Sequence, residues 1–209
     1  MDERPELDRG WLQRSAWIGG RVLIVPLNIV VTPFSERGQT EPSTWTGSDP
    51  GDALLVANNI WMPANIQFHL KQAVVFDTPL DLPKGSRTHD QLVLDVLSDR
   101  RPAGTLVHVF LINRVPGLTA GGTSYLNSDP EAACFVQQYD NARSSGRALA
   151  HELGHLLGLD HVKVDYQNER LAKTQVNNLM VEGMTVGTSL TPSQIKTAKG
   201  RKLAKKFGG

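Results

Sequence analysis

Two histidines four residues apart, in a stretch that favours a helix, constrain the fold of this chain more than any other feature. Ser144 or Ser145 is a suitable N-cap, and the residues from Arg147 to Leu157 are rich in Ala and Leu, which favour helix formation. On such a helix His151 and His155 lie on one face, one turn apart. This separation allows both imidazoles to reach a single Zn²⁺ ion at about 2.0–2.1 Å.

The residues after this helix supply a third candidate ligand. Gly158 can adopt the left-handed conformation that ends a helix and turns the chain, which would bring His161 back toward the first two histidines. Three neutral imidazoles leave the fourth position of a tetrahedral zinc open to water, as in catalytic zinc sites. Glu152 lies too far around the helix to be a good ligand, and we expect it to act as a general base toward this water.

The sequence HELGHLLGLDH, from His151 to His161, resembles the signature of the metzincin metallopeptidases. Met180, in Asn-Asn-Leu-Met, resembles the methionine of the Met-turn that lies beneath the metal in that clan. The short span between His161 and Met180 and the Gly-Leu-Asp-His ending are nearest to matrixins and their bacterial relatives. Val162 departs from the residues typical of the named families at that position. Val181 and Glu182 follow Met180, without the tyrosine that is an extra ligand in astacins and serralysins, so the subfamily stays open.

The resemblance implies a single metallopeptidase catalytic domain over residues 1–209, with α/β (α+β) architecture. It implies a mixed, twisted, five-stranded sheet with an active-site helix and a C-terminal helix, in two lobes around a cleft. The expected parts are an N-terminal arm (1–20), an upper lobe (21–158) and a lower lobe (159–209). The implied activity is that of a secreted zinc-dependent endopeptidase with one catalytic Zn²⁺ and a protein or peptide substrate.

Apolar runs and alternating patterns independently predict a mixed α/β sheet. The predicted strands span residues 21–31, 65–76, 105–112 and 133–139. Helices are predicted to begin near Pro50 and to span 88–97 and 191–207, and residues 32–51 are predicted to form a long loop. Pro26 indicates a bulge or an edge position within the first strand.

A short extended segment is a candidate for substrate binding; its residues are Thr123, Ser124, Tyr125 and Leu126. It resembles the edge strand that metzincins offer to substrate. An edge strand has unpaired N–H and C=O groups with which an extended peptide can pair. We therefore expect cleavage inside polypeptides, with the side-chain preference set by a pocket walled by residues 181–188.

Composition limits the alternatives. The single cysteine, Cys134, excludes an intrachain disulfide, and we expect it to be a small buried hydrophobe rather than a thiolate that occupies the open zinc position. The net charge is +1 and no apolar run approaches the roughly 18 residues that span a bilayer. We expect a monomer without a nucleic-acid or membrane partner. The N-terminal residues lack the apolar core of a secretory signal, and no motif supports a structural Ca²⁺.

Two other functions remain open. One is a catalytically silent, zinc-bearing module that binds peptides or proteins, and the other is a different hydrolase built on the same zinc helix. Gly158, His161 and Met180 weigh against the second, because another hydrolase need not keep them. The remaining histidines have no ligand spacing, and we expect ordinary polar or core roles for them; they are His69, His89 and His108.

Overall fold

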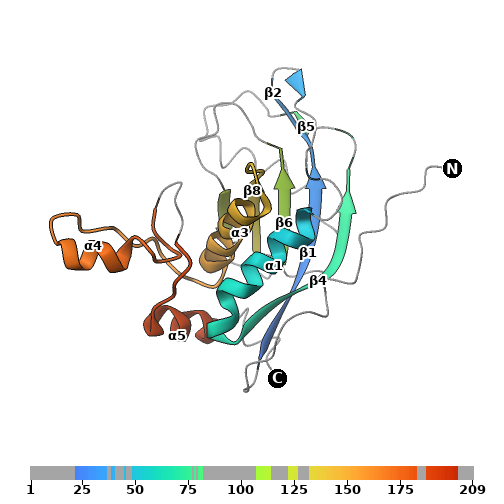
Figure 1. Ribbon diagram of the computed structural model, residues 1–209. Helices are drawn as coiled ribbons and strands as arrows, with labels where there is room; N and C mark the ends of the chain where they lie inside the picture. The colour runs from blue at the N-terminus through green and yellow to red at the C-terminus, as the bar shows by residue number, and fades with distance from the viewer. Residues whose placement is uncertain are drawn as a thin grey trace.

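The computed structural model describes residues 22–36, 39–40, 45, 49–76, 78, 80–81, 107–113, 122–126, 132–182 and 187–201. Within them the main sheet has five strands in the order β4-β1-β6-β8-β7 (Figure 1). In that order the strands are β4 (Ile66–Val75), β1 (Leu23–Thr32), β6 (Val107–Ile112), β8 (Ala132–Gln137) and β7 (Gly122–Leu126). Four strands are parallel and β7 is antiparallel to β8. The predicted mixed α/β class is confirmed.

Two neighbouring interior strands, β6 and β8, are buried along their whole length, which explains their nearly continuous apolar sequences. β1 has a register shift between Leu27 and Asn28, and its pairing with β6 begins only at Asn28. Pro26 pairs with His69 of β4 and lies directly before this register shift. The irregularity in β1 thus lies beside Pro26, as predicted.

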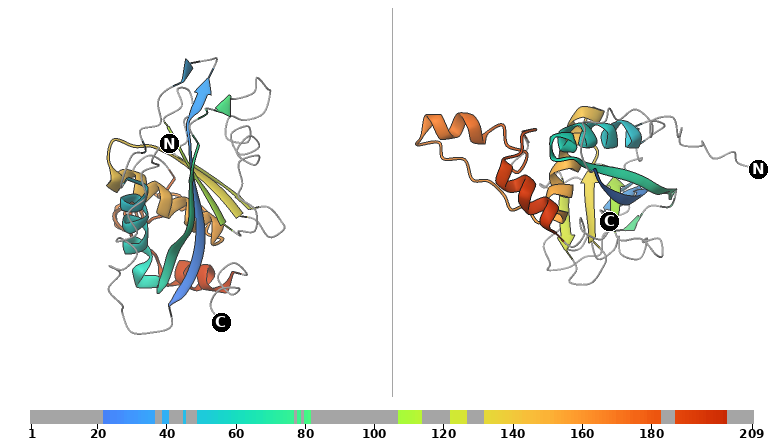
Figure 2. Two further views of the ribbon diagram at one scale, coloured as in Figure 1. Left: turned by 90° about the vertical axis from the view of Figure 1, so that its right-hand side faces the viewer. Right: turned by 90° about the horizontal axis from the view of Figure 1, so that it is seen from below.

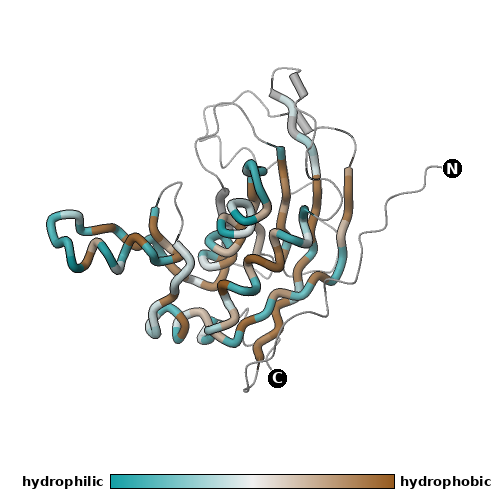
Figure 3. The backbone as a smooth tube through the Cα atoms, in the orientation of Figure 1, coloured by the Kyte–Doolittle hydropathy of each residue, from teal (hydrophilic) through white to brown (hydrophobic). Residues whose placement is uncertain are grey.

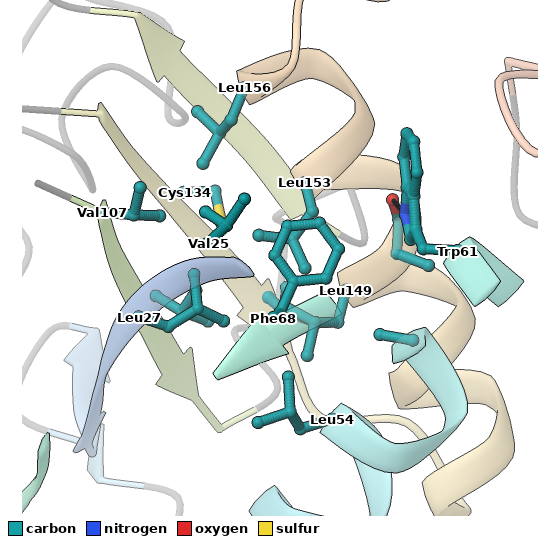
Figure 4. Close-up of a cluster of buried hydrophobic side chains, with 14 of the residues drawn as sticks. Val25, Leu27, Leu54, Trp61, Phe68, Val107, Cys134, Leu149, Leu153 and Leu156 are labelled. Atoms are coloured by element: carbon teal, nitrogen blue, oxygen red, sulfur yellow. Dashed lines mark hydrogen bonds between the residues drawn. The ribbon is translucent and has the colours of Figure 1, made fainter. Parts of the chain in front are cut away.

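Two helices cover one face of the sheet, α1 (Asp49–Trp61) and α3 (Ala142–Leu156) (Figure 2). They approach closely at Gly146, where a Cβ atom would stand 2.5 Å from Cβ of Val56. Apolar residues of the strands and of both helices form one buried core cluster. Figure 3 shows hydrophobic residues in brown along the strands and in both helices. Figure 4 shows Trp61, Phe68, Leu149 and Leu153 in this core, with the rings of Trp61 and Phe68 edge to face at 5.9 Å.

The loop predicted over residues 32–51 is wrong in part. It contains β2 (Phe34–Glu36) and β3 (Gln39–Thr40), which form a small second sheet with β5 (Leu80–Asp81). β5 lies far along the chain from its partner β2, so no local pattern indicates this pairing. The helix predicted near Pro50 is confirmed as α1, and a short 3-10 helix, η2 (Met62–Ala64), follows it.

The predicted cap of the histidine helix is also wrong. α3 begins at Ala142, and the side chain of Asn141 accepts a hydrogen bond from the backbone N–H of Ser144. Ser145 has another role, because its hydroxyl accepts the backbone N–H of Tyr139 at 3.2 Å. Ser, Thr, Asp and Asn are all strong N-caps, so composition alone does not select among neighbouring candidates.

Two further helices follow the segment 151–161 that contains the three histidines. α4 (Glu169–Gln175) was not predicted; it contains no buried residue and projects away from the sheet (Figure 1). α5 (Pro192–Gly200) starts as predicted, with a capping box between Thr191 and Gln194. It ends at Gly200, followed by an extended Arg201, and residues 202–207 of the predicted helix lie outside the described residues. The predicted 88–97 helix and the 1–20 arm lie outside the described residues, and none of the described helices could span a membrane.

Candidate metal centre

Three imidazole nitrogens converge at the end of α3. Nε2 of His155 lies 3.1 Å from Nε2 of His151, as expected for histidines one helical turn apart. Gly158 adopts φ +83°, and the amide of Leu159 returns to the carbonyl of Gly154 at 3.0 Å, which ends the helix and turns the chain. Nε2 of His161 then lies 3.2 Å from His151 and 3.0 Å from His155.

The hydrogen bonds of the other ring nitrogens fix the chemistry of this cluster. Nδ1 of His151 lies 2.7 Å from the carbonyl oxygen of Leu179, and Nδ1 of His155 lies 2.7 Å from that of Leu159. A carbonyl only accepts, so both Nδ1 atoms donate, and in the neutral rings both Nε2 atoms carry lone pairs. Lone pairs that face each other at this distance repel unless a cation lies among them. Tetrahedral Zn²⁺ with three His ligands separates the nitrogens by about 3.3 Å, close to the observed spacing.

The surroundings of His151 and His155 favour the neutral form of both imidazoles. Burial lowers the pKa of His151 from 6.5 to about 4; the hydrogen bond to Leu179 opposes this shift, and the neighbouring His155 and His161 add to it. Burial also lowers the pKa of His155. Since only the neutral ring has a lone pair for a metal, these shifts favour ligation near neutral pH. His151 is buried and His161 is exposed, so the cluster opens to solvent on one side.

A tight turn, residues 178–181, supports the cluster. Besides the Leu179 carbonyl that orients His151, the carbonyl of Met180 accepts the backbone N–H of Val162 at 2.7 Å, directly after His161. The side chain of Met180 is fully buried, and a Cβ atom on Gly154 would stand 2.5 Å from its sulfur. Met180 therefore packs against the helix face between the histidines.

Glu152 and Cys134 are both buried. Glu152 is 5% exposed and follows His151 on α3. Burial raises the pKa of the Cys134 thiol well above its usual value, and the charge of Glu152 raises it further. Cys134 is fully buried in β8 and is not in the ligand cluster. The structure therefore favours a protonated, structural thiol over a thiolate bound at the metal position.

The other candidate residues are placed as follows. β7, which ends the order of the described strands next to β8, contains Thr123, Ser124, Tyr125 and Leu126. The expected specificity pocket at 181–188 includes residues 183–186, which lie outside the described part of the chain. His69 is exposed and His108 is buried in the sheet, and the only His, Cys, Asp or Glu cluster suited to a metal among the described residues is that of His151, His155 and His161.

Sequence reasoning missed the groups that orient the ligands. Two are backbone carbonyls, those of Leu159 and Leu179, and every residue has such a group, so no side-chain pattern marks them. The third is Asn178, whose side-chain oxygen accepts the backbone N–H of Met180 at 2.9 Å. The tendency of Asn to cap turns is the one signal that could have indicated it.

Several solved structures have a fold similar to that of this chain. No family model matches the sequence, and no curated protein sequence matches it. Archaemetzincin from Methanopyrus kandleri has a TM-score of 0.53 at 14% identity, over 87% of this chain and 97% of that chain. Metalloproteinase-II from Bacteroides fragilis has a TM-score of 0.50 at 15% identity, over 85% of this chain and 52% of that one.

A chain from the structure of a chaperone–substrate complex also matches, with a TM-score of 0.54 at 13% identity, over 90% of this chain and 36% of that chain. The protein thus spans about a third of that chain and about half of metalloproteinase-II. At such identities the likeness concerns the fold alone. The chain has a fold found in metalloproteinases, and within that fold three histidines are placed so that they could bind a metal.

Proposed function

We propose that the protein is a zinc-dependent endopeptidase that hydrolyses peptide bonds inside proteins or peptides. The observation that carries the proposal is the convergence of three Nε2 atoms within 3.2 Å of one another, with Nδ1 of two rings already hydrogen-bonded to backbone carbonyls. When Zn²⁺ is bound by three neutral imidazoles, it provides an open coordination position and lowers the pKa of water there.

The side chains around the metal have distinct proposed roles. His151, His155 and His161 bind the ion, and the Leu179 and Leu159 carbonyls hold the first two rings in the orientation that aims Nε2 at it. Glu152 acts as the general base that removes a proton from the attacking water and then delivers it to the leaving amine. Its position beside His151 on α3 supports this role.

The substrate is proposed to bind along β7. This strand ends the five-stranded order, and its only partner among the described strands is β8. An extended peptide can add to such an edge through main-chain hydrogen bonds, with both of its ends free to leave the site. This mode of binding favours cleavage inside a polypeptide, with side-chain preference set by the segment 181–188.

We propose that the chain is a metzincin because of the HELGHLLGLDH sequence, with Met180 as the methionine of the Met-turn. Its full burial against Gly154 supports that role. We further propose that the chain forms two lobes that meet near Gly158, and that the protein is secreted and monomeric. Fractionation of cells and medium, and light scattering of the purified protein, test the last two.

Incubation with a pool of peptides blocked at both ends tests the proposed activity. We expect internal cleavage that stops when a chelator removes the metal and returns when zinc is added back. Cleavage confined to peptides with free termini would indicate an exopeptidase and contradict binding along β7. Zinc-loaded protein that binds the peptides without cleaving any of them would favour the alternative, a catalytically silent binding module.

A further inference from the structure

Two amide side chains join the C-terminal helix to the turn beneath the metal centre. Nδ2 of Asn178 donates to Oε1 of Gln194 at 2.9 Å, and Nε2 of Gln194 donates back to Oδ1 of Asn178 at 3.0 Å. Asn178 is 4% exposed and begins the 178–181 turn, whereas Gln194 lies in the first turn of α5. The two residues form a reciprocal pair, here called the amide clasp.

Backbone donors fix the orientation of both amides in the clasp. The N–H of Met180 donates to Oδ1 of Asn178, and the N–H of Thr191 donates to Oε1 of Gln194, each at 2.9 Å. Because a backbone N–H can only donate, each amide oxygen must face its backbone partner. Each nitrogen then faces the oxygen of the other amide, so neither side chain can flip without breaking several hydrogen bonds.

The turn held by the clasp hydrogen-bonds one candidate metal ligand and the residue that follows another. The carbonyl of Leu179 accepts from Nδ1 of His151, and the carbonyl of Met180 accepts from the N–H of Val162, next to His161, both at 2.7 Å. The peptide units that present these carbonyls lie immediately after Asn178. Rotation of either unit would turn a ligand away from the position shared by the three Nε2 atoms.

We infer that Gln194 is a positioning residue of the metal centre. Through Asn178 it fixes the peptide units at Leu179 and Met180, and through them the imidazole of His151 and the backbone directly after His161. Helix α5 therefore helps to orient the metal-binding histidines. The inference rests on the proposed binding of zinc but not on peptidase activity, because its effect is on metal affinity.

The variant Gln194→Glu disrupts the amide clasp but keeps the capping box of α5. Glutamate is a standard residue of the capping box, so its carboxylate still accepts from Thr191 N–H and from Asn178 Nδ2. It cannot donate to Oδ1 of Asn178, and it places an acceptor oxygen against it. Loss of groups that orient metal-binding histidines costs about 10- to 100-fold in affinity, and we expect about tenfold weaker zinc binding here.

The negative charge that Gln194→Glu introduces helps to interpret a loss of zinc affinity. A new carboxylate would by itself attract a cation, so weaker binding cannot be a charge effect. Gln194→Met, which is neutral and similar in size, should also weaken binding, and both variants should alter the absorption spectrum of bound Co²⁺. The matched control is Thr191→Ala, which removes the cap hydroxyl and destabilises α5 but leaves both clasp amides. We expect it to bind zinc as the unchanged protein does.

The measurement is the zinc dissociation constant from chelator competition, with thermal unfolding of each metal-free variant as the test of folding. Wild-type affinity in both Gln194 variants would overturn the inference. An equal loss in Thr191→Ala would also overturn it, because helix stability would then explain the effect. If the unchanged protein binds no zinc, both the proposed function and this inference are wrong. If it binds zinc but the Gln194 variants bind it equally well, only the inference is wrong.

Discussion

At the scale of residues, the candidate ligands could be predicted because their spacing is itself the signal. His151 and His155 share a helix face, and Gly158 at φ +83° makes the turn that returns His161. The orienting groups could not be predicted in the same way. The Leu179 carbonyl reaches His151 only in the folded chain, because 28 residues separate them. The clasp joins Asn178 to Gln194, and no local sequence motif indicates that these two residues pair.

Replacement of Glu152 by Gln tests the proposed general base. The side chain keeps its size and the three histidines are unchanged, so zinc binding and thermal stability should stay near their original values. The rate of peptide cleavage should fall about 10³-fold or more, because the group that accepts the proton is lost. A kcat above about a tenth of the original would rule out this role for Glu152.

Met180→Leu tests whether the buried methionine acts through packing. Swaps of similar volume in a core usually cost less than about 1.5 kcal/mol, and we expect a loss of about 1 kcal/mol in the free energy of unfolding. Peptidase activity per bound zinc should change little, because no ligand is removed. Urea denaturation and steady-state kinetics on the zinc-loaded protein measure the two effects, and a collapse of activity at unchanged stability would contradict this view of Met180.

At the scale of elements, the apolar patterns correctly predicted the main strands, because burial on one or both faces of a sheet determines which positions are apolar. The pattern failed for β2, β3 and β5, which are two or three residues long and pair across distant segments. It also failed for α4, which has no buried residue and so no apolar periodicity to detect.

Proline substitutions in β7 test the edge-strand model of substrate binding. Neighbouring residues of a strand direct their N–H groups to opposite sides, so Ser124→Pro and Tyr125→Pro remove donors from opposite edges of β7. One variant should lower the thermal stability by breaking the pairing with β8. The other should raise KM for blocked peptides with little change in stability, and both should retain zinc. Unchanged KM in both variants would contradict binding along this strand.

At the scale of the whole molecule, the sheet and helices α1 and α3 support the metal centre through the core. The indole of Trp61, at the end of α1, donates to the carbonyl of Ala150 at 3.1 Å, directly before His151. The mixed α/β class followed from the sequence, whereas the exact crossing of these helices depends on contacts such as Gly146 against Val56. Burial of a histidine in this frame couples folding to pH.

The metal-free protein should lose stability as the pH falls from about 6.5 to about 4. The folded-state pKa of His151 is lowered from 6.5 to about 4, so between these values the unfolded chain binds more protons. Stability must therefore decrease toward the acid side of this window. Denaturation of the metal-free protein at several pH values measures the slope, which His151→Gln should reduce. An equal slope in the variant would show that other groups cause it.

Metal analysis after exhaustive dialysis tests directly whether the three histidines bind zinc, without any assumption about substrate. We expect one zinc ion per chain in the unchanged protein and a near-complete loss in His155→Ala, whose fold is verified by circular dichroism. In the proposed site, zinc is held by three converging Nε2 atoms whose lone pairs repel one another without it. Removal of one of these ligands should therefore abolish tight binding. Retention of one zinc per chain by His155→Ala, or none in the unchanged protein, would contradict the account.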